Sequence, residues 1–180
     1  MENALKIARQ CARQMHPGQN RYKIIGRYRG YHGFTMGALS ATGQMERTNK
    51  FEPLVPGFLH AKPPHCFRCD FGKNYPGCDL ECAREFEAII EFERPETVAA
   101  IIAEPIIGGG GVIVPPDEYI PMLREICDRH GVLLILDEVI TGFGRTGEPF
   151  ASILYGVVPD MMTMAKGITS GYMPLGATAA

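Results

Sequence analysis

Two residues in the last third of the chain, Asp137 and Lys166, have the side chains that are hardest to explain as ordinary packing. Asp137 follows Val132–Leu136, an apolar run that is typical of a buried strand. Lys166 lies 29 positions later (166 − 137), between Ala165 and Gly167, with almost no polar residues near it in sequence. A carboxylate at the tip of a buried strand and an amine in an apolar setting each cost free energy unless they have partners. The two residues therefore predict a binding site.

The chemistry of the two side chains suggests one kind of ligand. A lysine amine forms a Schiff base with an aldehyde, and an apolar setting disfavours its ammonium form and so frees the nucleophile. A carboxylate keeps a pyridine nitrogen protonated, so that the ring can act as an electron sink. Pyridoxal 5'-phosphate (PLP) presents both an aldehyde and such a ring. The alternatives are a surface Lys166 in a glycine-bounded turn and an Asp137 that caps a turn after its strand.

An ordered set of motifs resembles the class III (subgroup II) PLP-dependent aminotransferases. Two further segments match upstream, the helix-like Glu2–Arg9 and the aromatic-His-Gly segment Tyr28–Gly33. The main motifs are AEPI at Ala103–Ile106, LLILDEVITGFGRTG at Leu133–Gly147, PDMMTMAKG at Pro159–Gly167 and MPLGA at Met173–Ala177.

This resemblance assigns roles to four residues. Lys166 matches the Schiff-base lysine, whose released amine also moves a proton between the substrate and the cofactor. Asp137 matches the partner of the pyridine nitrogen. Tyr31 matches an aromatic ring stacked on one face of the pyridine, and Val139 matches an apolar residue packed on the other face. We therefore expect Tyr31, Asp137, Val139 and Lys166 to form the cofactor site.

Three neighbouring residues need separate interpretations. Glu138 competes with Asp137 for the pyridine nitrogen, but strand alternation directs it to the opposite face of the sheet. His32 matches the family's histidine, which we interpret as structural support. Glu104 either faces the substrate side of the site or makes structural hydrogen bonds, and the sequence favours neither.

The alternation of helical and strand-like segments predicts an α/β fold with a mostly parallel sheet. We expect strands near 21–28, 97–103, 132–136 and 161–165, and helices over 2–15, 79–92 and from a cap at Asp117 to about His130. A region rich in proline and glycine, about 46–78, predicts a long surface excursion. The resemblance implies the three-layer α/β/α sandwich of the fold-type-I PLP-binding major domain.

Family members are usually more than twice as long as these 180 residues. We therefore expect residues 1–180 to be a partial PLP-binding large domain, truncated at both ends and without the C-terminal small domain. Such a chain should bind the cofactor weakly and turn over poorly by itself. The resemblance also implies a homodimer or larger homo-oligomer for the intact protein.

Composition and charge exclude several other classes of protein. The net charge of −2 gives no reason to expect nucleic acid or an anionic membrane as a partner. No apolar run approaches the roughly twenty residues that span a bilayer. The N-terminal residues lack the pattern of a signal peptide, so we expect a cytoplasmic protein.

One glycine motif could indicate a different cofactor. Gly142–Gly147 fits G-x-G-x-x-G and follows a strand, as in dinucleotide-binding folds. The preceding strand already ends in Asp-Glu, no clear long helix opens at Gly147, and no acidic residue lies about twenty positions further on. Gly108–Gly111 likewise lacks the ending of a phosphate-binding P-loop. We therefore do not expect a dinucleotide or ATP site.

Four of the six cysteines form two close pairs, with the spacing C-x2-C-x8-C-x3-C. This spacing suits four thiolates around zinc or an iron–sulfur cluster, and equally suits reduced cysteines without a ligand. A cytosolic location makes stable disulfides unfavourable. Metal binding therefore stays open for Cys66, Cys69, Cys78 and Cys82.

The resemblance implies transfer of an amino group from an amine or ω-amino acid to an oxo acid such as pyruvate. RYRGYHG, VPPDEY and SGYMPLGA resemble the branch that uses such donors with pyruvate. Decarboxylases, racemases and aminomutases share these motifs and form an alternative. A further alternative is a truncated chain with no activity of its own.

Overall fold

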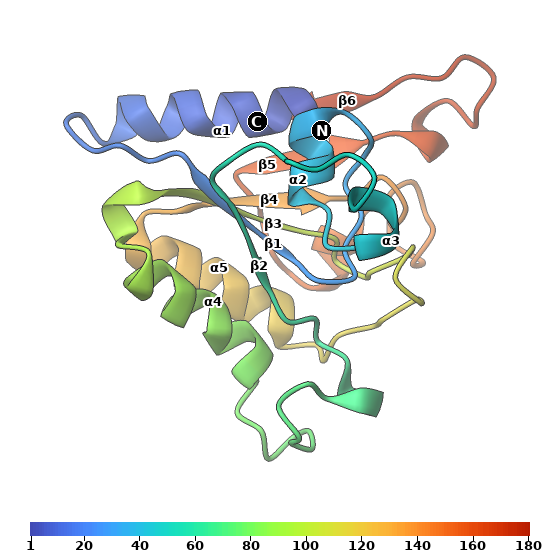
Figure 1. Ribbon diagram of the computed structural model, residues 1–180. Helices are drawn as coiled ribbons and strands as arrows, with labels where there is room; N and C mark the ends of the chain where they lie inside the picture. The colour runs from blue at the N-terminus through green and yellow to red at the C-terminus, as the bar shows by residue number, and fades with distance from the viewer.

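The computed structural model describes all of residues 1–180 (Figure 1). Six strands form a single sheet in the order β2-β1-β3-β4-β5-β6. The first five are parallel to their neighbours, and β6 runs antiparallel to β5. The strands are β1 (Lys23–Arg27), β2 (Phe58–Ala61), β3 (Val98–Ala103), β4 (Leu133–Asp137), β5 (Met161–Met164) and β6 (Ala177–Ala179).

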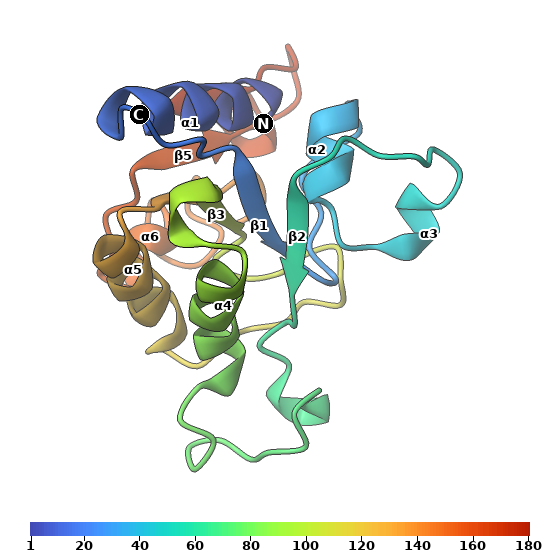
Figure 2. The ribbon, with the colours of Figure 1, turned by 60° about the vertical axis from the view of Figure 1, so that its left-hand side comes forward.

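Helices cover both faces of this sheet, which confirms the predicted three-layer α/β/α sandwich (Figures 1 and 2). One long helix packs on one face, and two pack side by side on the other. The long helices are α1 (Glu2–Met15) on the first face, and α4 (Glu81–Phe92) and α5 (Tyr119–His130) on the second. The shorter ones are α2 (Met36–Ala41), α3 (Met45–Thr48) and α6 (Ala151–Leu154), with 3₁₀ turns at Cys66–Arg68, Pro95–Thr97 and Lys166–Ile168.

Strand β3 lies in the middle of the sheet because both of its faces are apolar. Ala100 and Ile102 point to the core under α1, while Ile101 and Ala103 point to the core under α4 and α5. All six of its residues are buried. Burial of one isoleucine side chain contributes roughly 1.5–3 kcal/mol, so a strand that is apolar on both faces is stable only between two helical layers.

The ends of helix α5 confirm one prediction and correct another. Gly131 ends the helix in the left-handed conformation, with φ of 59°, as expected for a glycine at this position. The cap predicted at Asp117 is wrong, because the helix begins at Tyr119 and no side chain caps it. The backbone N–H of Tyr119 instead donates to the carbonyl of Pro116 at 3.0 Å, so a turn replaces the side-chain cap.

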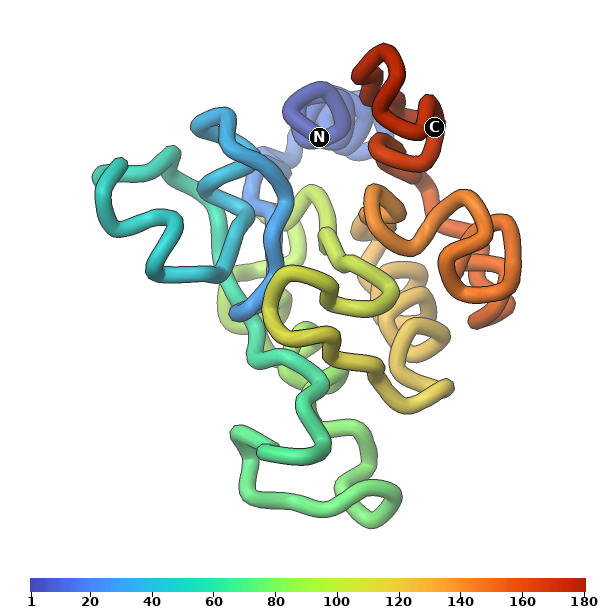
Figure 3. The backbone as a smooth tube through the Cα atoms, turned by 90° about the vertical axis from the view of Figure 1, so that its right-hand side faces the viewer, coloured from blue at the N-terminus to red at the C-terminus, as the bar shows by residue number.

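The region predicted as a surface excursion contains an edge strand that the sequence did not reveal. Strand β2 pairs in parallel with β1 over Ile24–Arg27. Three of its four residues are only half-buried, so the strand lacks the apolar pattern that would have identified it. Residues 62–80, which we call the cysteine segment, follow β2 and project away from the sheet (Figures 1 and 3). The prediction of an excursion therefore holds for this second part.

None of the helices is both long enough and apolar enough to cross a bilayer.

Candidate functional site

The loops that follow β1, β3, β4 and β5 meet at the carboxyl edge of the sheet, which faces the viewer in Figure 3. Open α/β sheets bind ligands at this edge. A cavity of about 80 Å³ lies there, and all four predicted site residues line it. Its lining is Tyr31, His32, Gly33, Glu104, Asp137, Val139, Ile140 and Lys166.

Asp137, the last residue of β4, is the buried carboxylate of this cavity, with 4% of its surface exposed. Its Oδ1 accepts hydrogen bonds from the backbone N–H of Val139 at 3.2 Å and from the hydroxyl of Thr163 at 3.1 Å. Its Oδ2 accepts one hydrogen bond, from Nδ1 of His32 at 2.8 Å. Because a carboxylate oxygen can accept two, Oδ2 has capacity for a further donor from the cavity.

His32 holds the carboxylate of Asp137 in place through its Nδ1. An ionised carboxylate only accepts hydrogen bonds, so we assign the proton of the imidazole to Nδ1. The backbone N–H of His32 donates to Oγ1 of Thr42 at 3.0 Å, which ties the residue to the end of helix α2. Its Nε2 is buried and has no hydrogen-bond partner. This arrangement agrees with the structural role that we expected for His32.

Glu104 follows β3 and is 3% exposed. Its Oε1 accepts a hydrogen bond from the backbone N–H of Tyr31, and its Oε2 accepts one from the backbone N–H of Gly108, both at 3.0 Å. The carboxylate therefore joins the loops after β1 and β3. Of the two interpretations that the sequence left open, these contacts favour the structural one.

Tyr31 lies at the mouth of the cavity with its ring half-buried. The guanidinium of Arg47, in helix α3, sits over this ring at 4.6 Å from its centroid. Such a cation–π contact is worth roughly 0.5–1 kcal/mol at an exposed site. Arg47 could not be predicted as a partner of Tyr31, because nothing in the local sequence pattern links the two residues.

The neighbours Val139 and Glu138 point in opposite directions, as strand alternation predicts. Val139 lines the cavity, whereas Glu138 is fully buried away from it. The carboxylate of Glu138 accepts hydrogen bonds from the backbone N–H groups of Ala151 at 3.0 Å and Ser152 at 2.7 Å. It therefore caps the start of helix α6 and is not available to the cavity.

Lys166 lies on the wall shared by this cavity and a second hollow of about 400 Å³. Lys166 is exposed, so our prediction of an apolar environment for this side chain is wrong. Its backbone has φ of 48°, a left-handed conformation that costs roughly 1–2 kcal/mol for a residue with a side chain. Next to it, a Cβ on Gly167 would lie 2.9 Å from the side chain of Phe143, so only glycine lets the two loops approach.

Thr163 is a site residue that the sequence analysis missed. It pairs with Asp137 in the register of β4 and β5, and its hydroxyl donates to the carboxylate. One signal was present: Thr163 is the only polar residue of the strand Met161–Met164. A lone polar residue beside a strand-end carboxylate is a candidate partner for it.

The G-x-G-x-x-G motif at Gly142–Gly147 forms a loop, and the helix that follows it has only four residues, Ala151–Leu154. This agrees with the absence of a long helix on which we rejected a dinucleotide site.

Comparison with known proteins gives close relatives along the whole chain. It is 58% identical over 179 residues to "Uncharacterized aminotransferase YhxA" of Bacillus subtilis, covering 99% of this chain and 38% of that protein. It is 42% identical to a taurine–pyruvate aminotransferase of Bilophila wadsworthia, covering 98% of this chain and 38% of the relative. The chain thus spans about two fifths of the length of these relatives.

Solved structures share the fold. An aminotransferase of Bacillus anthracis superposes with a TM-score of 0.92 at 50% identity, covering 99% of this chain and 40% of that one. A PLP-bound amine transaminase from an uncultivated Pseudomonas species also superposes with a TM-score of 0.92. The two chains are 46% identical, and the match covers 98% of this chain and 40% of that one. The family described as "Aminotransferase class-III" matches residues 1–180. The chain belongs to the class III aminotransferase family.

Proposed function

We propose that the chain forms the PLP-binding part of an enzyme that transfers an amino group from an amine or ω-amino acid to an oxo acid such as pyruvate. One observation carries the proposal: the buried carboxylate of Asp137 and the amine-bearing Lys166 line the same cavity at the carboxyl edge of the sheet. The relatives support the reaction type, because they include proteins named taurine–pyruvate aminotransferase and omega-aminotransferase.

The residues present fit the cofactor. Oδ2 of Asp137 is buried and has room for one more donor, which a protonated ring nitrogen would supply. The cavity and the hollow beside it share Val139, Ile140 and Lys166. With volumes of about 80 and 400 Å³, they give a space within the usual range of roughly 300–1,000 Å³ for small-ligand pockets.

PLP, when bound, supplies an aldehyde that joins to amines and a protonated ring that takes up negative charge. Asp137 would hold the proton on the ring nitrogen, and His32 and Thr163 keep its carboxylate in place. Val139 and Tyr31 would pack on the two faces of the ring and exclude water. Lys166 would hold the cofactor through its amine and, once released, move the proton at the substrate carbon.

The sequence left a decarboxylase, racemase or aminomutase as an alternative. Two of the relatives are named taurine–pyruvate aminotransferase and adenosylmethionine-8-amino-7-oxononanoate aminotransferase. These names favour transamination for this chain as well.

Three further expectations belong with this proposal. Residues 1–180 form a partial large domain, the intact protein is a homodimer or larger homo-oligomer, and its location is cytoplasmic.

The test is to trap the cofactor on the chain. The purified chain is incubated with excess PLP and reduced with borohydride, and the labelled peptide is identified by mass spectrometry. Excess cofactor allows even weak binding to be captured. We expect the label on Lys166, and we expect Lys166→Ala to lose both the label and the visible absorption band.

The matched control is Lys50→Ala. Lys50 is exposed and does not line the cavity, so this variant should keep the label on Lys166. Label distributed over surface lysines, at equal levels in wild type and Lys166→Ala, would overturn the assignment of the site. Incubation with an amine donor and pyruvate then separates the reactions: transamination produces alanine, whereas decarboxylation releases carbon dioxide.

A further inference from the structure

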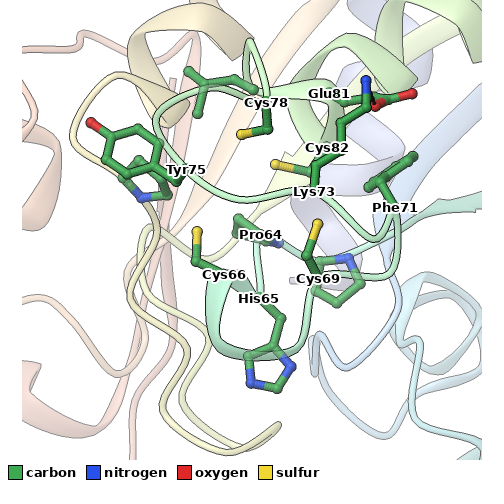
Figure 4. Close-up of a pocket in the computed structure, with 13 residues that line it drawn as sticks. Pro64, His65, Cys66, Cys69, Phe71, Lys73, Tyr75, Cys78, Glu81 and Cys82 are labelled. Atoms are coloured by element: carbon green, nitrogen blue, oxygen red, sulfur yellow. Dashed lines mark ion pairs between the residues drawn. The ribbon is translucent and has the colours of Figure 1, made fainter.

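Four of the six cysteines line one small cavity, which shares no lining residue with the cavity around Asp137 and Lys166 (Figure 4). They come from two stretches of chain that face each other. Cys66 opens the 3₁₀ turn Cys66–Arg68 and Cys69 follows it directly, whereas Cys78 and Cys82 lie on either side of the first residue of α4. In Figure 4 the thiols of both stretches point into the space between them.

The cavity has the size of a single ion. Its volume is about 20 Å³, slightly above the roughly 10–15 Å³ that one water-sized particle needs. Its lining combines the four cysteines with apolar residues such as Phe71 and Leu80 and with polar residues such as His65 and Lys73. An iron–sulfur cluster contains several metal and sulfide atoms and is too large for this space.

We propose that Cys66, Cys69, Cys78 and Cys82 bind one zinc ion through four thiolates. The spacing of two close pairs, C-x2-C and C-x3-C, matches the paired ligands of structural zinc sites. Zinc prefers soft thiolate ligands in tetrahedral geometry, which two facing pairs supply. On binding, each thiol loses its proton to solvent, so the affinity for zinc rises with pH.

The four cysteine sulfurs must move closer to one another to bind the ion. As they stand, no three His, Cys, Asp or Glu side chains of the chain are close enough to hold a metal. Four sulfurs at 2.3 Å from zinc lie about 3.8 Å from one another. Rotation of a cysteine side chain between staggered positions moves its sulfur by about 3 Å, so side-chain rotation with a small closure of the segment suffices.

The site has a structural role. The cysteine segment has no strand and only one 3₁₀ turn, and exposed side-chain contacts such as Tyr75 to Glu118 join it to the rest of the chain. An ion bound by both stretches would fasten the start of this segment to the first turn of α4. Lys73, which also lines the cavity and pairs with Glu81 at 2.5 Å, places a cation beside the thiolates.

The experiment measures metal content, so its result is independent of the proposed transamination. The chain is produced with zinc in the medium, purified without chelator and analysed by mass spectrometry for metals. We expect about one zinc per chain, lost in the double variant Cys66→Ser/Cys69→Ser and kept in the matched control Cys11→Ser. Cys11 lies in α1, on the other side of the sheet.

A second measurement covers the case in which the double variant does not fold. Cobalt added to the wild-type chain after zinc removal should give the intense absorption of tetrahedral thiolate-bound cobalt, and thiol alkylation should abolish it. The proposal is overturned by wild-type chain that binds neither metal. It is equally overturned by metal content unchanged in the double variant, or by disulfides among the four cysteines in a non-reducing peptide map.

Discussion

The polar side chains around Asp137 and the four cysteines Cys66, Cys69, Cys78 and Cys82 are held in place by different means. Asp137 lies at the end of a central strand, and its partners come from the neighbouring strand β5 and from the loop after β1. Three of the four cysteines lie on a segment that leaves the sheet, and none of them has a covalent partner. The first group is fixed by the packing of the sheet, whereas the second depends on what the thiols themselves bind.

This difference separates two ways to build a site. At the sheet edge, parallel register brings Thr163 beside Asp137 before any ligand is present. In the cysteine segment the backbone supplies no strand and only short turns, so the geometry of the thiols must be completed by an ion. We therefore expect changes at the sheet edge to act on cofactor binding and folding, and changes in the cysteine segment to act on metal content.

The largest effect, a loss of affinity for PLP, is expected for Asp137→Asn. The variant removes the charge that would hold the proton on the ring nitrogen, and it leaves His32 beside a neutral amide. Loss of one partner of a buried charged pair costs about 3 kcal/mol or more, so the affinity for PLP should fall by roughly 10²-fold. Titration of the chain with PLP, followed by absorption or fluorescence, measures this affinity.

Asp117→Asn is the matched control, because Asp117 is exposed and distant from the cavity lining. Equal affinities for PLP in Asp137→Asn and wild type would remove Asp137 from the site. Zinc content should not change in either variant, because the sheet edge and the cysteine segment are independent.

A smaller effect, on folding, is expected for Glu138→Ala. The change leaves the backbone N–H groups of Ala151 and Ser152 without their acceptor, in a place that water does not reach. A buried donor without a partner costs about 1–3 kcal/mol, so the free energy of unfolding should fall by about 2–3 kcal/mol. Urea unfolding followed by circular dichroism measures the loss.

Glu125→Ala, on the exposed side of α5, should change this free energy by under about 0.5 kcal/mol. A Glu138→Ala variant with the stability of wild type and a reduced affinity for PLP would reverse the roles that we assign to the two neighbouring carboxylates.

Thr163→Val should act on both folding and cofactor binding, but more weakly. Valine keeps the shape of the side chain and removes the hydroxyl that donates to Oδ1 of Asp137. A hydrogen bond to a charged group contributes about 1.5 kcal/mol, which is up to about tenfold in affinity for PLP. Thr178→Val, at the paired position on β6, is the control and should leave this affinity unchanged. An equal loss of affinity for PLP in both variants would show that the change acts through the pairing of β5 with β6 and not through the hydrogen bond to Asp137.

The apolar strands could be predicted from the sequence because their signal is local. β3, β4 and β5 each appear as short apolar runs bounded by turns, and the predicted bounds differ from the observed ones by only one residue at an end. β2 and β6 could not be predicted, since they are short, half-exposed edge strands whose pairing comes from the neighbouring strand. A strand of this kind has no pattern of its own.

The candidate site likewise has residues that could be predicted from the sequence and contacts that could not. Asp137 and Lys166 were identified from chemistry that is costly without partners, and the resemblance added Tyr31 and Val139. The contacts that hold these residues in place could not be predicted, because they join loops far apart in sequence: Arg47 over Tyr31, and Glu104 between Tyr31 and Gly108. The exposure of Lys166 is also a property of the assembled loops rather than of the apolar residues beside it in sequence.

The smallest effect is expected for Glu87, in the middle of helix α4. Glu87 accepts hydrogen bonds from His130 at 3.1 Å and Arg129 at 3.0 Å, which join α4 to α5. The hydrogen bond from His130, and then those from Arg129, hold the pKa of Glu87 below its ordinary value of 4.5. A lowered pKa means that this contribution to stability is present above about pH 4.5 and is lost as the pH falls below it.

Glu87→Gln should therefore lower the free energy of unfolding by under about 1 kcal/mol at pH 7 and flatten its fall below pH 4.5. Urea unfolding from pH 3 to pH 7 measures both. Because these contacts join α4 to α5 without any metal, zinc content should stay the same in Glu87→Gln. A loss of zinc in this variant would show that the packing of α4 on α5 is coupled to the cysteine site, which would then depend on helix packing as the sheet edge does.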